Sequence, residues 1–370
     1  MAINIVEFTE QYEVEVDSFN DRLSSNNIPF SFPSKAKKYE SDDLGENRYP
    51  TEYYYLAVDE AGKVHGGYIY QEHQFVLKGA TYIFGCMKLP LSEGIIDKAY
   101  NMVGIMLVRH ALTINPFVYA LGMGGEEGPF AKLLRAMGWQ ITLIPFYFSI
   151  LNSTNFLRNI NVLRTNHFRS RMLDFTASCG LGWLVHALFE SIISIKNIRT
   201  RKASSVLINR FAEWTDEIWN SVSTEYPFVS VRDAATLNRI YRIDSTRFKH
   251  MKIIQSDKVI GWSTLLDITK TDSPYFGNMR VMCIINSHCV AGKEAALVNA
   301  LKIYSRSSGY DLLVGNFSYH NYLEALQACG FMLGPSNLAL ALSPNLSKLR
   351  EQNHIESNMM HITRGDGDGE

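Results

Sequence analysis

The sequence lacks the features that mark several classes of protein. Its 370 residues contain five scattered cysteines and no CxxC pair, which argues against a zinc site or a disulfide framework and favours a reducing compartment. The N-terminus has no basic start followed by an apolar run, so no secretory signal is expected. The net charge of −1 gives no global field that would attract nucleic acid. We therefore expect a cytoplasmic protein that binds no nucleic acid and no metal.

What the sequence contains is an ordinary globular composition arranged as a repeat. Hydrophobic residues make up 46% and charged residues 20%, and the length allows two domains with separate cores. A Lys-Val-x-Gly turn ends at Gly66 and again at Gly261, and a helix ends in a Gly-aromatic pair at Gly138 and again at Gly330. Between these marks lie 72 residues in the first copy and 69 in the second. Equal order and length favour a duplication.

Both copies predict the same series of elements: a hairpin, a strand, a helix, a buried strand, a second helix and a last strand. In the first copy we place them at 53–58, 67–71, 82–84, 95–112, 117–121, up to Gly138, and 146–148. In the second copy we place them at 252–254, 259–265, 280–285, 293–306, 312–314, up to Gly330, and 338–342.

The segment between the copies is apolar. Between Asp174 and Lys196, Glu190 is the only formally charged residue, and basic residues flank the segment (Arg158, Arg164, Arg169 and Arg171 before it; Arg199, Arg201 and Lys202 after it). Residues 174–196 could be a connector buried between the two halves, or they could lie in a membrane interface with the basic border on the headgroups. A membrane span is disfavoured because it would contain His186 and Glu190 and separate the two halves.

These patterns divide the chain into four parts. We expect an N-terminal domain over 1–153, an apolar and basic helical connector over 154–205, and a C-terminal domain over 206–347. The last residues, 348–370, have little apolar content, so we expect a disordered tail.

The order of elements and two sequence phrases resemble the GNAT (Gcn5-related N-acetyltransferase) fold. The phrases are the helix endings Ala131–Trp139 (AKLLRAMGW) and Asn321–Phe331 (NYLEALQACGF), in which a glycine turns the helix into the last strand. The resemblance covers most of residues 50–153 and 206–345. It implies an α/β protein of two tandem GNAT-like units, each a mixed, mostly antiparallel sheet flanked by helices. Fem-type aminoacyl transferases are similar, since they too have two such units.

The family binds the pyrophosphate of acyl-CoA on a glycine-containing loop at the start of its main helix, where bare backbone N–H groups attract phosphate. The corresponding loop of the first unit, 88–94, has one glycine, a proline and a carboxylate. That of the second unit, 287–293, has a glycine, an alanine and a lysine, although neither loop has the family's full motif. The resemblance therefore implies acyl-CoA as co-substrate, bound by the second unit through Val290, Ala291, Gly292, Lys293, Asn316 and Asn321.

Candidate catalytic residues follow from the same resemblance. Many family members protonate the departing thiolate with a tyrosine in the helix before Gly-Phe. Leucines occupy that position here, and Tyr322, one turn earlier, is the candidate acid; packing of an amphipathic helix is its alternative. Glu72 and His73 on the first hairpin are candidates for the base, unless they form an exposed strand end. Glu93 could bind or deprotonate the amine, or complement a helix N-terminus.

Three functions remain open from the sequence. The first is an N-acyltransferase that moves an acyl group from acyl-CoA to a small amine, such as an amino sugar in surface polysaccharide biosynthesis. The second is a non-catalytic duplicated scaffold at the membrane surface. The third is a Fem-type transferase that takes its acyl group from aminoacyl-tRNA.

Overall fold

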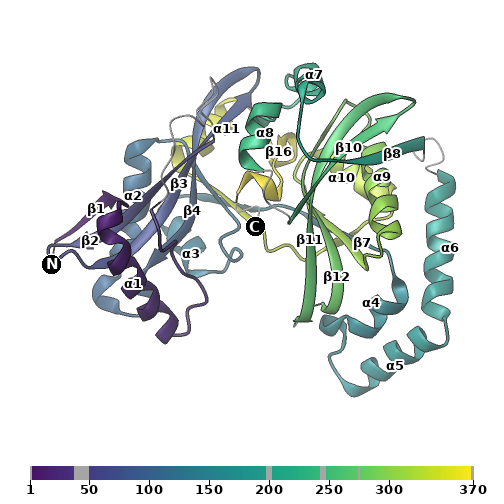
Figure 1. The fold of residues 1–370 in the computed structure, drawn as a ribbon, viewed down its shortest axis with the longest axis horizontal. Coiled ribbons are helices and arrows are strands. Elements are labelled where there is room, and N and C mark those ends of the chain that lie inside the picture. The colour runs from purple at the N-terminus through teal and green to yellow at the C-terminus, as the bar shows by residue number, and fades with distance from the viewer. Residues whose placement is uncertain (1, 37–49, 197–201, 242–246, 274–275, 368–370) are drawn as a thin grey trace.

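The protein consists of two sheets that stand side by side, with helices packed around them (Figure 1). The computed structural model describes residues 2–36, 50–196, 202–241, 247–273 and 276–367. Within these residues the two units run through the same order of elements, and each sheet is mostly antiparallel with one central parallel pair. The first sheet has a second parallel pair at its margin, between residues 228–229 and 360–361.

The first sheet is built mainly from the first unit. Its strand order is β1 (Ile3–Glu7), β2 (Thr51–Asp59), β3 (Val64–Leu77), β4 (Ala80–Ser92), β5 (Val118–Leu121), β15 (Ala339–Leu342) and β6 (Gln140–Leu143). The helices of this unit are α1 (Glu13–Ser25), α2 (Val103–Ile114) and α3 (Pro129–Ala136). The predicted helix over 95–112 therefore begins later, because two short 3-10 turns, Glu93–Ile95 and Lys98–Tyr100, come before it.

The second sheet repeats this plan. Its strand order is β14 (Met332–Gly334), β7 (Phe146–Ile150), β13 (Leu312–Asn316), β12 (Gly277–Cys289), β11 (Lys258–Ser273), β10 (Phe248–Gln255) and β8 (Ala203–Ile208). The helices of this unit are α7 (Glu213–Val222), α8 (Ala234–Ile240), α9 (Glu294–Ser307) and α10 (His320–Ala328).

The two units exchange strands. β7, from the first unit, pairs with β13 and β14 of the second sheet. β15, from the second unit, lies between β5 and β6 of the first sheet. β9 (Phe228–Ser230) also crosses over and pairs with the end of β3. Sheet membership thus departs from chain order, and the predicted domain limits at 153 and 206 separate strands from the sheets to which they belong.

The Gly-aromatic helix ends have the geometry that the sequence predicts. Gly138 and Gly330 adopt φ of +82° and +80°, the left-handed conformation that ends many helices. After each glycine the aromatic amide donates back to the last helical turn, from Trp139 to Leu134 and from Phe331 to Leu326, both at 3.0 Å. Each glycine therefore terminates its helix in a Schellman motif and directs the chain into the next strand.

The prediction of a disordered tail over 348–370 is wrong for the residues that the structure describes. The segment contains helix α11 (Pro344–Gln352), strand β16 (Met360–His361) and a 3-10 turn, Arg364–Asp366. Three of its apolar side chains, Ile355, Met360 and Ile362, are buried in one core with residues of both units, and Leu349 and Met359 pack against that core half-buried. Apolar content was therefore a poor guide, because three well-spaced side chains are enough to anchor the segment. Residues 368–370 lie outside the described residues.

The connector lies on the outside of the second sheet, away from the first sheet (Figure 1). It consists of α4 (Ser153–Asn159), α5 (His167–Ser178) and α6 (Leu181–Lys196). Many of its large apolar side chains are exposed, so the interpretation of a connector buried between the halves is wrong. Among the described residues no single helix is long and apolar enough to cross a membrane; α5 and α6 pass that test only as a pair bent by 68°.

Candidate active site

In both sheets the central strand parts from its parallel neighbour. The β4–β5 ladder ends at Cys86 and Tyr119, and the β12–β13 ladder ends at Ile284 and Gly315. Each central strand also carries a bulge near that end, seen as a register shift against its antiparallel neighbour. A bulge bends and twists its strand, which separates it from the strand on its other side. We call these two places the first and second divergence points.

The loop that enters α9, beside the second divergence point, already holds a carboxylate. Glu294 is the first residue of α9 and is 5% exposed, and Asn321 Nδ2 lies 3.5 Å from its Oε1. Burial raises the pKa of Glu294. Gly292 adopts φ of +71°, and the amide of Val290 donates to the carbonyl of Ile260 at 2.8 Å. Amides at a helix start are the donors that phosphate uses, and an anion here would meet the negative charge of the Glu294 carboxylate in the same turn.

The loop that enters α2, beside the first divergence point, differs. Its two 3-10 turns are capped by Ser92, which accepts from the Gly94 amide at 3.1 Å, and by Asp97, which accepts from the Ala99 amide at 2.9 Å. α2 then begins with no acidic residue in its first turn and no side-chain cap. Within the part of the chain that the structure describes, no acceptor is recorded for the amides of residues 103–105. These amides can therefore accept an anion without displacing a carboxylate.

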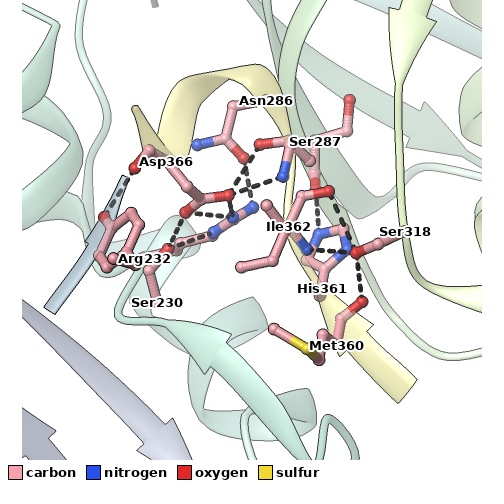
Figure 2. A network of polar contacts seen from close by, with 11 residues as sticks. Ser230, Arg232, Asn286, Ser287, Ser318, Met360, His361, Ile362 and Asp366 are labelled. Carbon is pink, nitrogen blue, oxygen red and sulfur yellow. Dashed lines mark hydrogen bonds and ion pairs between the residues drawn. The ribbon is translucent and has the colours of Figure 1, made fainter. Parts of the chain in front are cut away.

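The C-terminal segment fills the second divergence point, as Figure 2 shows. His361 Nε2 lies 2.9 Å from the carbonyl of Ser287 on β12. On the other side, Ser318, just after β13, bonds the backbone of Met360 and Ile362. Residues 360–363 thus bridge the two strands where they have stopped pairing with each other. The space that a ligand would need between these strands is occupied by the protein's own backbone.

A buried ion pair holds this segment in place. The Arg232 guanidinium donates to both carboxylate oxygens of Asp366, at 2.9 and 2.8 Å, and to the side chain of Asn286 on β12. Ser230 donates to the same carboxylate (Figure 2). Arg232 and Asp366 are each 1% exposed. A pair so deeply buried and so fully hydrogen-bonded fixes the position of the segment, because removing either partner leaves an uncompensated charge.

Comparisons with known proteins agree with this geometry at the level of the fold. No protein-family model matches the sequence, and no curated protein sequence matches it either. A GCN5-related N-acetyltransferase from Anabaena variabilis is similar in structure, with a TM-score of 0.53 and 9% identity, over 92% of this chain and 72% of that one. The N-myristoyltransferase of Saccharomyces cerevisiae, solved with myristoyl-CoA bound, is also similar, with a TM-score of 0.53 and 8% identity, over 92% and 79%.

The chain has the GNAT fold. The fold class predicted from the sequence is confirmed: the protein is α/β, with two GNAT-like units, each a mixed sheet flanked by helices. In both units the divergence point lies beside the start of the main helix, α2 in the first GNAT unit and α9 in the second.

Of the candidate catalytic residues, Glu93 belongs to a buried ionic cluster. Its carboxylate lies 2.7 Å from Arg22 Nε of α1 and 2.6 Å from His65 Nδ1, and His65 Nε2 lies 3.1 Å from Asp59. Burial would raise the pKa of Glu93, but the bonds from Arg22 and His65 outweigh it and hold this pKa below its usual range. A carboxylate stabilised in its ionised form by two partners is a weak base, so this geometry favours a role in joining α1 to the sheet.

Glu72 and His73 lie in the middle of β3 rather than at an exposed strand end. His73 is 5% exposed, its Nε2 lies 2.6 Å from Gln71 Oε1, and its ring meets Phe75 and Tyr119. Burial lowers the pKa of His73 to about 4, so the ring is neutral at pH 7. A pKa so far below 7 makes the imidazole a weak base, and its Nε2 already faces Gln71, so the role of Glu72 or His73 as the base remains a prediction.

Tyr322 is fully buried in the second unit. Its ring stacks between Phe317 and His361, and its hydroxyl donates to Cys289 Sγ at 3.5 Å. Burial raises the pKa of Tyr322 well above its usual value. Tyr322 can reach a thiolate only after the C-terminal segment moves, because His361 covers one face of its ring. Its role as an acid remains a prediction.

The predicted CoA-binding residues of the second unit lie in the loop before α9, at the end of β13 and in α10. Their polar side chains already have hydrogen-bond partners within the protein. Lys293 Nζ bonds Gln255 Oε1 at 3.2 Å, and Asn321 Nδ2 lies 3.5 Å from Glu294 Oε1. Asn316 donates to the carbonyl of Ile144 at 3.2 Å. Ala291, exposed, completes the loop between Val290 and Gly292. These side chains tie the loop to its neighbours, and their binding role also stays a prediction.

Sequence reasoning missed the residues that distinguish the two units. Glu294 directly follows the loop 287–293. An acidic residue in the first turn of a helix could have been recognised in the sequence as unfavourable for phosphate binding. Arg232, His361 and Asp366 gave no such signal, because their meeting depends on a C-terminal segment that returns to β12 from far along the chain.

Proposed function

We propose that the protein is an N-acyltransferase that moves an acyl group from acyl-CoA to a small amine, such as an amino sugar. The fold supports acyl transfer in general, since an N-acetyltransferase and an N-myristoyltransferase share it at TM-scores of 0.53. The observation that carries the proposal is the divergence of a bulged central strand from its parallel neighbour beside a helix start. This arrangement offers an extended ligand both backbone bonds along the strand and amides for its phosphates.

We place the acyl-CoA in the first unit. The start of α2 has amides without an acidic neighbour, whereas the start of α9 carries Glu294 and the second divergence point holds residues 360–363. Placing the donor in the second unit, as the sequence favours, would require both Glu294 and this segment to move. The two placements make opposite predictions for matched variants.

Calorimetry on the full chain tests whether acetyl-CoA and free CoA bind, and variants of the two units test which unit binds them. Met102→Asp places a carboxylate at the N-cap of α2, where it would accept from the amides that phosphate needs. We expect this variant to bind at least about tenfold more weakly, because one charge-assisted contact is worth about that much. An N-cap aspartate stabilises a helix, so an unchanged or higher melting temperature separates this loss from unfolding.

Gly292→Glu is the matched variant in the second unit. An added Cβ meets no atom within 4 Å there, but the left-handed backbone, with φ of +71°, strains any side chain, so the melting temperature of this variant is measured as well. We expect it to retain binding. Loss with Gly292→Glu and not with Met102→Asp would move the donor to the second unit. No binding of either ligand by the wild type would overturn the proposal and leave the non-catalytic scaffold and the aminoacyl-tRNA donor.

The acceptor is proposed by chemistry alone, as a primary amine on a small polar molecule. Release of free CoA thiol in the presence of glucosamine, compared with the N-acetylated sugar, would test it. We expect turnover only with the free amine, and equal release with both would mean hydrolysis rather than transfer. We also propose a cytoplasmic location, which fits a CoA-dependent reaction and five cysteines that are all free thiols.

A further inference from the structure

The connector helices α5 and α6 each carry a stripe of exposed apolar side chains. On α6 the exposed side chains Leu181, Leu184, Val185, Leu188, Ile192 and Ile195 recur at three- and four-residue spacing and form one stripe. On α5 the exposed side chains Phe168, Met172 and Phe175 form a second stripe, of which Phe168 is 76% and Phe175 70% exposed. Monomeric soluble proteins seldom leave so many large apolar side chains together in solvent.

The opposite face of α6 is already used. Glu190 lies 2.7 Å from Lys302 and 2.8 Å from Arg306 of α9, and His186 Nε2 lies 2.9 Å from the carbonyl of Ile150. Phe189 and Ile193 lie close to Gly330 at the end of α10. These contacts fix the helix on the second sheet with its apolar stripe outward. The helix therefore cannot leave the protein to span a bilayer without breaking a buried ion pair.

The charges around the stripes have one sign. From 158 to 195 the acidic residues are Asp174 and Glu190, and both are paired: Asp174 lies 2.6 Å from Arg164, and Glu190 is bound to α9. Arg158, Arg169 and Arg171 are exposed, and Lys202 is exposed where the chain resumes after 197–201. Arg199 and Arg201 of the predicted basic border lie outside the described residues. Arg164 and Arg158 both lower the pKa of Asp174, whereas Arg169 and Arg171 on α5 are exposed cations for which no carboxylate partner is seen in the described segment.

We propose that this surface docks the protein on the face of an anionic lipid bilayer. The stripes would enter the boundary between headgroups and acyl chains, and the arginines would meet phosphate groups. A second copy of the chain fits worse, because pairing this surface with itself would bring the same arginines together without an acidic partner. The proposal is independent of acyl transfer and would hold for a non-catalytic protein as well.

Vesicle flotation of the full chain tests the proposal, with phosphatidylcholine vesicles that contain or lack phosphatidylglycerol. We expect the protein to float with the anionic vesicles and far less with the neutral ones. The double variant Leu184→Glu and Leu188→Glu should lower the partition constant about tenfold for each substitution, because burying one leucine is worth about that much. Arg169→Glu and Arg171→Glu should each lower it about fivefold, on anionic vesicles only.

Matched controls lie elsewhere on the surface. Val14→Glu with Leu333→Glu replaces two apolar side chains that are 78% and 66% exposed, and Arg109→Glu with Arg135→Glu reverses two exposed cations. Both controls should float like the wild type.

Two results would overturn the proposal. The first is a wild-type protein that does not float with anionic vesicles, or a folded Leu184→Glu, Leu188→Glu variant that floats as well as the wild type does. The second is a concentration-dependent dimer in sedimentation, abolished by the same variant and without flotation, which would assign the surface to a second copy of the chain.

Discussion

The two divergence points share a backbone plan but differ in what surrounds them. In the first, α2 begins without an acidic residue, and the nearest buried carboxylate, Glu93, is bound by Arg22 and His65. In the second, Glu294 lies in the first turn of α9, and the C-terminal segment lies between the strands. The difference comes from a few side chains and one returning segment. The same fold can therefore leave room for a ligand in one copy and hold a segment of the chain itself in the other.

The largest change in stability is expected at the buried ion pair that holds the C-terminal segment in the second divergence point. Asp366→Ala leaves the buried Arg232 guanidinium without its partner, and we expect the free energy of unfolding to fall by about 4 kcal/mol in urea titrations. Amides of residues 360–363 should also exchange with solvent faster than in the wild type, whereas amides of β1 and β2 should keep their protection.

Arg364→Ala is the control on the same turn, since Arg364 is only half-buried and its bond to Asn316 is 3.4 Å long. It should cost less than about 1 kcal/mol. Equal losses of unfolding free energy for Arg364→Ala and Asp366→Ala would contradict the conclusion that the buried ion pair holds the C-terminal segment in place.

The carboxylates near the two helix starts should respond to pH with opposite signs. The folded pKa of Glu93 is lowered, so its contribution to stability is present above its ordinary pKa of 4.5 and lost as the pH falls through the folded value. The folded pKa of Glu294 is raised, so its contribution is full below 4.5 and lost as the pH rises from there through the folded value.

At pH 7, Glu93→Gln should therefore cost about 2 kcal/mol of unfolding free energy, while Glu294→Gln should raise stability by a smaller amount. Urea midpoints measured from pH 7 down to pH 4 check both signs. A loss of stability in Glu294→Gln at pH 7 would show that the interactions of the carboxylate, among them its bond to Asn321, outweigh the cost of burying its charge.

The two helix-ending glycines should differ by a smaller amount. Gly138→Ala costs about 1 kcal/mol, because alanine must adopt a left-handed backbone. Gly330→Ala should cost more, since its added carbon would lie 3.1 Å from Ile193 and 3.2 Å from Phe189, against 3.8 Å from Pro344 at Gly138. Thermal denaturation of both variants checks the order, and equal shifts would mean that α6 is held less firmly than its contacts imply.

Much of the fold was accessible from the sequence because it depends on local patterns. Alternation gave the strands, and the glycines at 138 and 330 gave the helix ends. The strand exchange was not accessible, because β7 and β15 are short apolar strands whose composition does not say which sheet they join. The ordered C-terminal segment was missed for a related reason: its order depends on a core formed by both units.

The site was less predictable than the fold. Loop motifs indicate where backbone amides lie, but they do not show which amides are already bonded. Gly292 and Lys293 suggested a phosphate-binding loop. Glu294, the next residue, places a carboxylate at the same helix start, where it disfavours a bound phosphate. His73 could be recognised as a polar residue of the first hairpin, but its burial against Tyr119 required the partner strands in place.

The exchange of β7 and β15 has a consequence for how such a chain can evolve. β7 of the first half lies within the second sheet, and β15 of the second half lies within the first sheet. A shortened gene that kept one copy would therefore encode a sheet with a missing strand and an open edge. The two copies therefore depend on each other for complete sheets, whether or not both bind a ligand. Side chains at one helix start can then differ from those at the other, as Glu294 of α9 differs from the start of α2, without loss of either sheet.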